Sequence, residues 1–263
     1  VTEPLSPTVS IMLPVVLNNY RETPSCTLDS PFSLEIAAIH EIDPAGGQAV
    51  SAEAEAAWLA RYEEGFPTLV EAFEDSGACW TRIEVSWRKI QPATPATYDW
   101  SFFDEKLGLL AETGVHIIAI IDKVPDWAGP HERGPIDADR LDEFQAFLGA
   151  VVNRYGKAPY NIRHWELFNE ADWVYYADPD HPEINVGWGF KAPEYAQMLK
   201  DVAYPVIKGT DPGATILMGG LAYDAFEEYR YNVSPCTTCP FHRYFPDDVI
   251  AAGGEPYFDA LNI

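Results

Sequence analysis

From residue 34 onward, short apolar runs alternate with segments whose apolar residues recur at helical spacing. The runs that predict strands are 34–39, 80–87, 115–121, 162–168, 214–220 and 257–263. The segments that predict amphipathic helices are 52–64, 67–77, 101–112, 138–155, 192–208 and 242–252. Strands that alternate with helices indicate a parallel sheet with crossover helices, so the predicted fold class is α/β.

Six such units fit the chain, and its 263 residues are enough for a barrel of about 250 residues. We therefore predict a (β/α)8 TIM barrel of which about six β/α units are present. The last predicted strand reaches Ile263, and an open parallel sheet would expose an edge, so we expect the barrel to continue. Residues 34–263 form the predicted barrel. Residues 1–33, with five prolines and little periodicity, form a predicted lead-in or linker.

The net charge of the chain limits the classes of binding partner that are expected. The chain has 41 Asp and Glu against 17 Lys and Arg, which gives a formal net charge of -24. Phosphate binding needs clustered basic residues, so nucleic acid and anionic membranes are not expected as partners. No apolar run reaches about 18 residues, so no transmembrane helix is expected either. The acidic composition fits a secreted protein, and the oligomeric state is not predicted by the sequence.

The chain contains four cysteines. A zinc site would need four ligands, and the sequence has no second closely spaced cysteine pair. Cys236 and Cys239 are therefore interpreted as a loop disulfide or as two plain thiols. Cys79 precedes an apolar strand and is expected to be a buried thiol.

In an α/β barrel the active site forms at the carboxyl ends of the strands. The densest polar cluster at such a place is WELFNEAD, residues 165–172. Glu170 falls at the end of the predicted fourth strand, where an apolar, aromatic environment disfavours a charged carboxyl. A carboxyl that keeps its proton can serve as a general acid. Glu166 lies deeper in the strand and is expected to be an internal hydrogen-bonding carboxylate.

Several segments together carry a family resemblance: TRIEVSW, YDWSFFD, IIDKVPDWA, WELFNEAD and YFDALNI. With these segments, residues 34–263 resemble the retaining clan A glycoside hydrolases, and among them the family 39 β-xylosidase-like and family 5 groups. Members of this clan are (β/α)8 barrels whose fourth strand ends in Asn-Glu. The resemblance implies a carbohydrate substrate, no cofactor and no metal. The implied reaction is retaining hydrolysis of β-glycosidic bonds in a neutral oligo- or polysaccharide.

The resemblance also implies roles for individual residues. Glu170 corresponds to the acid/base of the clan, and Asn169 to the Asn that hydrogen-bonds the sugar 2-OH. Arg82 corresponds to the Arg that supports the nucleophile; its alternative role is that of an interior ion-pair partner. The nucleophile of the clan is a Glu at the end of the seventh strand. Because the sequence ends in the predicted sixth strand, we expect this Glu beyond residue 263 and the 263-residue chain alone to be inactive.

Aromatic residues near the strand ends are candidates for sugar contacts. Trp127 and Trp173 lie where the clan often places flat rings against the apolar face of a sugar. Large aromatics at such positions are also common packing residues. His40, at the end of the first predicted strand, is a further candidate for substrate contact. Trp188 and Tyr175, in a long loop, are candidates for the roof of a sugar cleft.

Two other functions remain open. The first is a carbohydrate-binding barrel without turnover, which would keep the aromatic residues but lack the nucleophile of the seventh strand. The second is a metal-dependent barrel hydrolase. The sequence has no HxH motif after its first predicted strand, which is the pattern that this second function would require.

Overall fold

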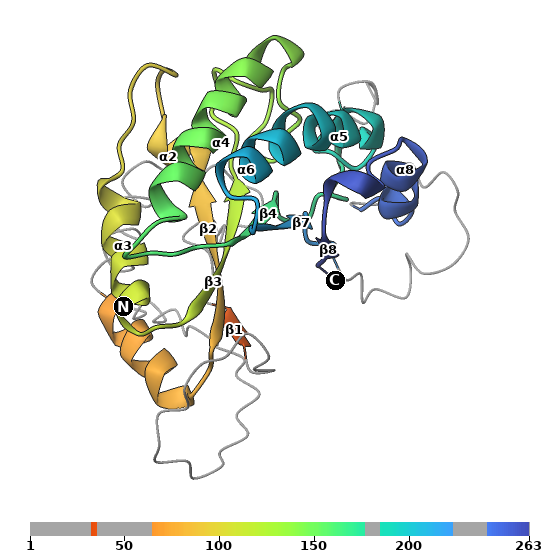
Figure 1. The fold of residues 1–263 in the computed structure, drawn as a ribbon. Coiled ribbons are helices and arrows are strands. Elements are labelled where there is room, and N and C mark those ends of the chain that lie inside the picture. The colour runs from red at the N-terminus through yellow and green to blue at the C-terminus, as the bar shows by residue number, and fades with distance from the viewer. Residues whose placement is uncertain (1–32, 36–64, 177–184, 223–240, 263) are drawn as a thin grey trace, which may run out of the picture.

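The computed structural model describes residues 33–35, 65–176, 185–222 and 241–262, which are coloured in Figure 1. One six-stranded sheet runs through these ranges in the order β1-β2-β3-β4-β7-β8, and every neighbouring pair is parallel. The strands are β1 (Ser33–Glu35), β2 (Trp80–Ser86), β3 (His116–Asp122), β4 (His164–Leu167), β7 (Thr215–Met218) and β8 (Ala260–Leu261). Spatial order equals chain order, as successive β/α units of a barrel require, and the predicted α/β barrel architecture is confirmed.

Helices connect the strands and lie along one side of the strand row (Figure 1). They comprise a helix over residues 65–76, α2 (Trp87–Ile90), α3 (Ser101–Glu112), α4 (Leu141–Tyr155), α5 (Ala192–Met198), α6 (Tyr204–Thr210) and α8 (Phe245–Ala251). Single turns of 3₁₀-helix occupy Ala138–Arg140 and Glu255–Tyr257. A two-stranded antiparallel hairpin, β5 (Tyr175–Tyr176) with β6 (Asn185–Val186), stands apart from the main sheet.

The core lies between the sheet and this helical layer. Strand β3 is almost entirely apolar because both of its faces are covered, one by helices and one by the barrel interior. On the helical side, aromatic rings pack against one another: Trp87 contacts Phe144 and Phe147, and Phe168 contacts Phe144 and Tyr195. All five side chains are at most 1% exposed, so this layer fixes where β4 ends.

Some predicted elements differ from those observed. The predicted helix 192–208 is one continuous helical segment, but Leu199–Ala203 forms a π-helix between α5 and α6. Pro205 explains the interruption, because it lacks the amide hydrogen that an α-helix would direct at the carbonyl of Asp201. The predicted sixth strand, 257–263, is reduced to Ala260–Leu261, since a 3₁₀ turn over Glu255–Tyr257 precedes it.

Cys79 corrects one prediction from the sequence. Its side chain is 1% exposed, as expected of a buried residue, but it takes part in a disulfide and is not a thiol. Spacing alone does not determine cysteine pairing, which is why the sequence did not indicate this bond. The other three cysteines lie outside the described residues, as do residues 1–32 of the predicted lead-in and the predicted helix 52–64.

In the ranges that the structure describes, no helix is both long enough and apolar enough to cross a membrane.

Candidate functional site

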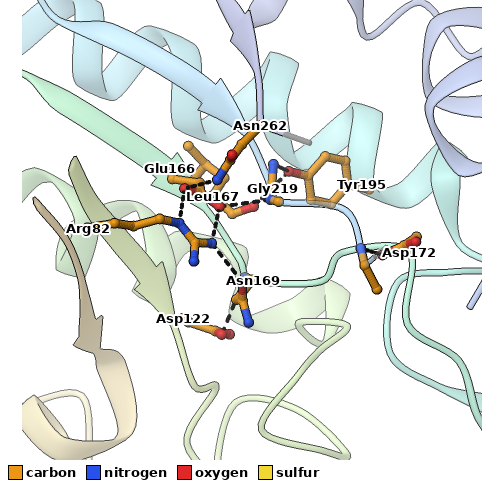
Figure 2. Close-up of polar contacts among 11 residues, drawn as sticks. Arg82, Asp122, Glu166, Leu167, Asn169, Asp172, Tyr195, Gly219 and Asn262 are labelled. Atoms are coloured by element: carbon orange, nitrogen blue, oxygen red, sulfur yellow. Dashed lines mark hydrogen bonds and ion pairs between the residues drawn. The ribbon is translucent and has the colours of Figure 1, made fainter. Parts of the chain in front are cut away.

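Polar side chains gather where the parallel strands end, as Figure 2 shows. The group comprises Arg82 from β2, Asp122 from β3, Glu166 from β4, Asn169 just after β4, and Asn262 just after β8. Because parallel strands end at the same edge of a sheet, residues separated by up to 180 positions meet in one place. This edge is where a barrel of this kind places its active site.

Glu166 is the centre of this network. Arg82 donates to both of its oxygens, from Nε to Oε2 at 2.8 Å and from Nη2 to Oε1 at 2.6 Å. The backbone amide of Gly220 donates to Oε1 at 2.8 Å, and Asn262 Nδ2 donates to Oε2 at 3.0 Å. The Glu166 side chain has no exposed surface, so these donors replace the water that the charge loses on burial. The prediction that Glu166 is an internal hydrogen-bonding carboxylate is confirmed.

The glycine pair after β7 makes this arrangement possible. A Cβ on Gly219 would lie 2.4 Å from the carbonyl oxygen of Leu167. A Cβ on Gly220 would lie 2.9 Å from Glu166 Oε1 and 3.0 Å from Arg82 Nη2. Side chains at these two positions would therefore push β7 away from β4 and block the amide that binds Glu166.

Asn169 is oriented by two contacts. Arg82 Nη2 donates to the side-chain oxygen Asn169 Oδ1 at 2.6 Å, and the backbone N–H of Asn169 donates to Asp122 Oδ2 at 3.3 Å. Because a guanidinium only donates, the oxygen of the Asn169 side chain must face Arg82 and its NH₂ group must point elsewhere. Burial raises the pKa of Asp122, although the neighbouring Lys123 opposes this change. Among the residues that the structure describes, no acceptor is recorded for Asn169 Nδ2, so it can donate to a ligand.

Glu170 lies on the rim of the site. Its side chain is 36% exposed, and its backbone has φ +48°, a left-handed conformation that is uncommon for residues other than glycine. The flanking backbone is tied down, because Ala171 donates to Gly220 O and Trp173 donates to Glu170 O. The structure thus brings Arg82 and Asn169 into contact. Glu170, the next residue along the chain after Asn169, has its carboxyl at the surface.

Arg133 is the direct partner of Glu170, and the sequence did not indicate it. Its Nη1 lies 2.6 Å from Glu170 Oε2, and its guanidinium lies over the ring of Trp173 at 5.0 Å from the centroid. Arg133 belongs to the loop after β3, which ends at the same edge of the sheet as β4. The sequence signal that could have indicated Arg133 is the presence of a basic residue in such a loop of a strongly acidic chain.

Asp172 is a second carboxyl close to Glu170. It is 4% exposed and accepts a hydrogen bond from the Ala222 amide at 3.0 Å. Burial raises the pKa of Asp172 to about 6, and the charge of Glu170 adds to this effect, while the amide of Ala222 opposes it. The sequence analysis expected a carboxyl that keeps its proton at Glu170; the residue beside this site whose pKa burial raises is Asp172.

The aromatic candidates have different environments. Trp127 is half-buried, donates from Nε1 to the carbonyl of Gln91 at 2.9 Å and packs edge-on against Trp87. Trp173 is also half-buried, and its ring contacts the guanidinium of Arg133 and the imidazole of His131. The stacking of Arg133 on Trp173 shows that part of this ring is already occupied by the protein.

Trp188 does not form a roof over the site, which corrects that expectation. Its side chain is 2% exposed and packs against Phe168 and Tyr195. Its size and loop position suggested an exposed role, but apolar partners from α5 and the end of β4 bury it. The side chain of Tyr175 and the whole of His40 lie outside the described residues.

Within the described part of the chain, no group of three or more His, Cys, Asp or Glu side chains is arranged to hold a metal ion.

Comparisons with known proteins show which solved structures this architecture is similar to. No protein-family model and no curated protein sequence matches the chain. Among solved structures, it is similar to a family 39 glycoside hydrolase from the gut symbiont Bacteroides cellulosilyticus WH2, with a TM-score of 0.51 and 17% identity. The match covers 76% of this chain and 35% of that one.

Two other solved structures are similar at lower scores. Endoglucanase Cel5A from Thermotoga maritima gives a TM-score of 0.43 and 17% identity, over 61% of this chain and 50% of that one. Endo-glycoceramidase II from Rhodococcus sp. gives 0.43 and 16%, over 60% and 45%. The predicted structural resemblance to clan A barrels is thus confirmed for the fold, through the family 39 structure. The chain spans half or less of the length of each of these three glycoside hydrolases.

Proposed function

We propose that this chain is the greater part of a glycoside hydrolase barrel that cleaves β-glycosidic bonds of a neutral oligo- or polysaccharide with retention of configuration. The observation that carries the proposal is the pair Asn169–Glu170 at the carboxyl end of β4, with the Asn169 amide oriented by Arg82. The likeness of the fold to a family 39 glycoside hydrolase supports it.

Glu170 is assigned as the acid/base. Its carboxyl lies at the surface of the site, where a substrate can reach it, and no other strand end of the described sheet presents an Asn-Glu pair. In the first step the protonated carboxyl gives its proton to the leaving glycosidic oxygen, and in the second step the carboxylate takes a proton from the attacking water. Retention also requires a nucleophilic carboxylate about 5–5.5 Å away, which we assign to a Glu beyond residue 263.

Asn169 is assigned to the sugar 2-OH. Because its oxygen is held by Arg82, its NH₂ group is the part that remains for a hydroxyl. In this assignment Arg82 keeps the amide of Asn169 from rotating. Trp127, close to the carboxyl end of β3, and Trp173, just after β4, are both half-buried and are assigned as the candidates for a flat sugar contact.

Aryl β-glycosides with different leaving groups test this assignment on the full-length protein. In Glu170→Gln, kcat/KM should fall by about 10²–10⁴-fold for 4-nitrophenyl or poorer leaving groups. The loss should be far smaller for 2,4-dinitrophenyl glycosides, whose leaving group needs no proton. The matched control is Glu143→Gln, because Glu143 lies on α4 and pairs with Arg140, away from the strand ends.

Two outcomes would contradict the proposal. Equal losses for good and poor leaving groups would show that Glu170 is not the acid. Sugar binding by calorimetry, combined with no turnover of any dinitrophenyl glycoside by the full-length protein, would instead identify a carbohydrate-binding barrel.

A further inference from the structure

Arg133 contacts the carboxyl of Glu170 at the rim of the site. We propose that Arg133 is a substrate-binding residue that donates hydrogen bonds to the hydroxyls of a neutral leaving-group sugar. Through these bonds the protein favours oligosaccharides over glycosides whose leaving group carries no hydroxyls. This inference deepens the proposed function and rests on the assignment of Glu170 as the acid.

The carboxyl that Arg133 contacts determines how close it lies to the scissile bond. Arg133 Nη1 donates to Glu170 Oε2 at 2.6 Å, and among the described residues no donor is recorded for Glu170 Oε1. A general acid must lie within about 2.6–3.2 Å of the atom that it protonates, so Oε1 is the oxygen left to face the glycosidic bond. The guanidinium is then one carboxyl group away from that bond, within reach of a sugar attached to it.

The depth of the residues separates the two sides of the glycosidic bond. Asn169, which we assign to the 2-OH of the retained sugar, is held by Arg82 next to Glu166 (Figure 2). The Glu166 side chain has no exposed surface, whereas Arg133 and Glu170 are 27% and 36% exposed. The retained sugar therefore binds inward, and the leaving-group sugar lies toward the rim, on the side of Arg133.

Most of the hydrogen-bonding capacity of Arg133 is not used by the protein. A guanidinium carries five N–H donors, and in the part of the chain that the structure describes the only recorded hydrogen bond of the Arg133 side chain is the one to Glu170. The guanidinium lies over the Trp173 ring, 5.0 Å from its centroid, which restricts its orientation. The remaining donors bind water in the free protein, and the hydroxyl oxygens of a sugar can replace that water.

The charges around Arg133 favour a neutral ligand over an anionic one. Burial alone would lower the pKa of Arg133, but the hydrogen bond and charge of Glu170, together with the charges of Asp122 and Glu132, raise it. The positive charge of Arg133 is thus already offset by acidic groups of the protein. An anionic sugar would be repelled by these groups, whereas the hydroxyls of a neutral sugar bring no charge.

The loop that carries Arg133 is fixed by contacts within the protein. The Arg133 amide donates to His131 Nδ1 at 3.1 Å, and Gly187 donates to the carbonyl of Gly134 at 2.7 Å. Gly134 has φ +87°, and a Cβ there would collide with the indole of Trp188. The residue next to Arg133 must therefore be a glycine packed against a buried tryptophan. Because the loop is already ordered, little conformational entropy is lost when Arg133 binds a sugar.

Matched substrates test the inference on the full-length protein. For glucose, xylose and mannose in turn, kcat/KM is measured on the β-1,4-linked disaccharide and on the methyl and phenyl β-glycosides, and the sugar that the wild type hydrolyses fastest is kept. In Arg133→Met, kcat/KM should fall about 10–100-fold more for the disaccharide than for either simple glycoside, because only the disaccharide loses hydrogen bonds to a charged group. Arg133→Gln, which keeps neutral donors, should show a smaller difference.

The simple glycosides separate sugar binding from an effect that Arg133 exerts through Glu170. The disaccharide and the methyl glycoside both need a proton from the acid, and methanol is a poorer leaving group than a sugar. If Arg133 acted only by holding Glu170, the methyl glycoside would lose at least as much as the disaccharide, and the inference would be overturned. Arg140→Met is the matched control, because Arg140 lies in the same connection after β3 but pairs with Asp139 and Glu143. It should change none of the three rates.

Inhibition by free sugars tests whether the leaving-group sugar is neutral. D-glucose and D-glucuronate differ only in the group at carbon 6, and both can occupy the leaving-group side during hydrolysis of the phenyl glycoside. Glucuronate should inhibit the wild type no more strongly than glucose does. A preference for glucuronate that Arg133→Met abolishes would show that the ligand of Arg133 is anionic, contrary to the inference.

The same measurements separate this inference from the proposed function. Hydrolysis of the phenyl glycoside by Arg133→Met shows that the variant is folded; if that activity is lost, Arg133→Gln repeats the comparison. If the wild type hydrolyses none of these substrates, or if Glu170→Gln shows no dependence on the leaving group, the proposed function fails and this inference with it. If Glu170→Gln does show that dependence and the Arg133 variants affect the disaccharide no more than the simple glycosides, only the role of Arg133 fails.

Discussion

At the scale of single residues, the pair of Arg82 and Glu166 is the feature of the site that most depends on complete hydrogen bonding. A carboxylate with no exposed surface is stable only because its donors replace lost hydration, and Arg82 supplies two of its four hydrogen bonds. Arg82→Met should lower the free energy of unfolding by about 3–5 kcal/mol, because it leaves a buried charge without its cation. Urea unfolding monitored by tryptophan fluorescence measures this loss.

The double variant Arg82→Met, Glu166→Gln provides the control. It removes the cation and the buried charge together, so it should lose less than the sum of the two single variants. Arg82→Lys should fall between the wild type and Arg82→Met, because an ammonium cannot bridge two carboxylate oxygens and Asn169 at once. An Arg82→Met protein as stable as the wild type would show that Glu166 is not charged in the folded state.

Asp172 lowers the stability of the folded protein in a pH-dependent way. Its pKa is raised by burial to about 6 from 3.8, so the folded protein binds an extra proton between these values and loses stability as pH rises through them. A shift of this size corresponds to about 3 kcal/mol at pH 8. Asp172→Asn keeps an oxygen for the Ala222 amide and removes the charge, so it should stabilise the protein by about 2–3 kcal/mol at pH 8.

Urea unfolding at pH 8 and pH 4 measures this effect, because near pH 4 Asp172 is neutral in the folded protein and the advantage of Asn should be small. Asp139→Asn is the matched control, since the Asp139 side chain is 78% exposed and should respond little at either pH. Equal stabilisation of Asp172→Asn at both pH values would show that charge is not the cause.

At the scale of elements, the strands were predicted well because runs of apolar residues in the sequence indicate where they lie. Strand β3 was expected at 115–121 and is observed at His116–Asp122; β2 was expected at 80–87 and is observed at Trp80–Ser86. Strand β4 was expected at 162–168 and is observed at His164–Leu167, so the place of Asn169 and Glu170 just after its carboxyl end was also predicted. Strand periodicity is a local property, which is why one sequence was sufficient.

The turn after β4 was not predictable in the same way. Phe168 and Glu170 adopt φ +68° and φ +48°, which their residue types disfavour. Burial of Phe168 among rings from α4 and α5, together with hydrogen bonds to the segment after β7, holds this conformation. These partners are distant in sequence. The Arg133–Glu170 pair was missed for the same reason, since it depends on how two loops meet.

At the scale of the whole molecule, the dominant physical property is charge. The chain has a net charge of -24 and only 17 basic residues, so its excess carboxylates repel one another throughout the folded state. Salt screens this repulsion, and the screening length falls from about 30 Å at 0.01 M to about 10 Å at 0.1 M. Salt also weakens ion pairs such as Arg163–Asp211, but exposed pairs of this kind contribute only about 0–1 kcal/mol each.

Repulsion should therefore dominate, and the thermal midpoint should rise when sodium chloride is increased from 0.01 M to 0.3 M. A gain of about 1 kcal/mol corresponds to roughly 2–4 °C for a chain of this size. Differential scanning calorimetry measures the midpoint, and sucrose at matched osmolality is the control because it leaves charges unscreened. A midpoint that falls with salt would mean that ion pairs outweigh net repulsion. Affinity for the neutral sugar that we propose as substrate should in contrast change little with salt, because no charge is brought in by that ligand.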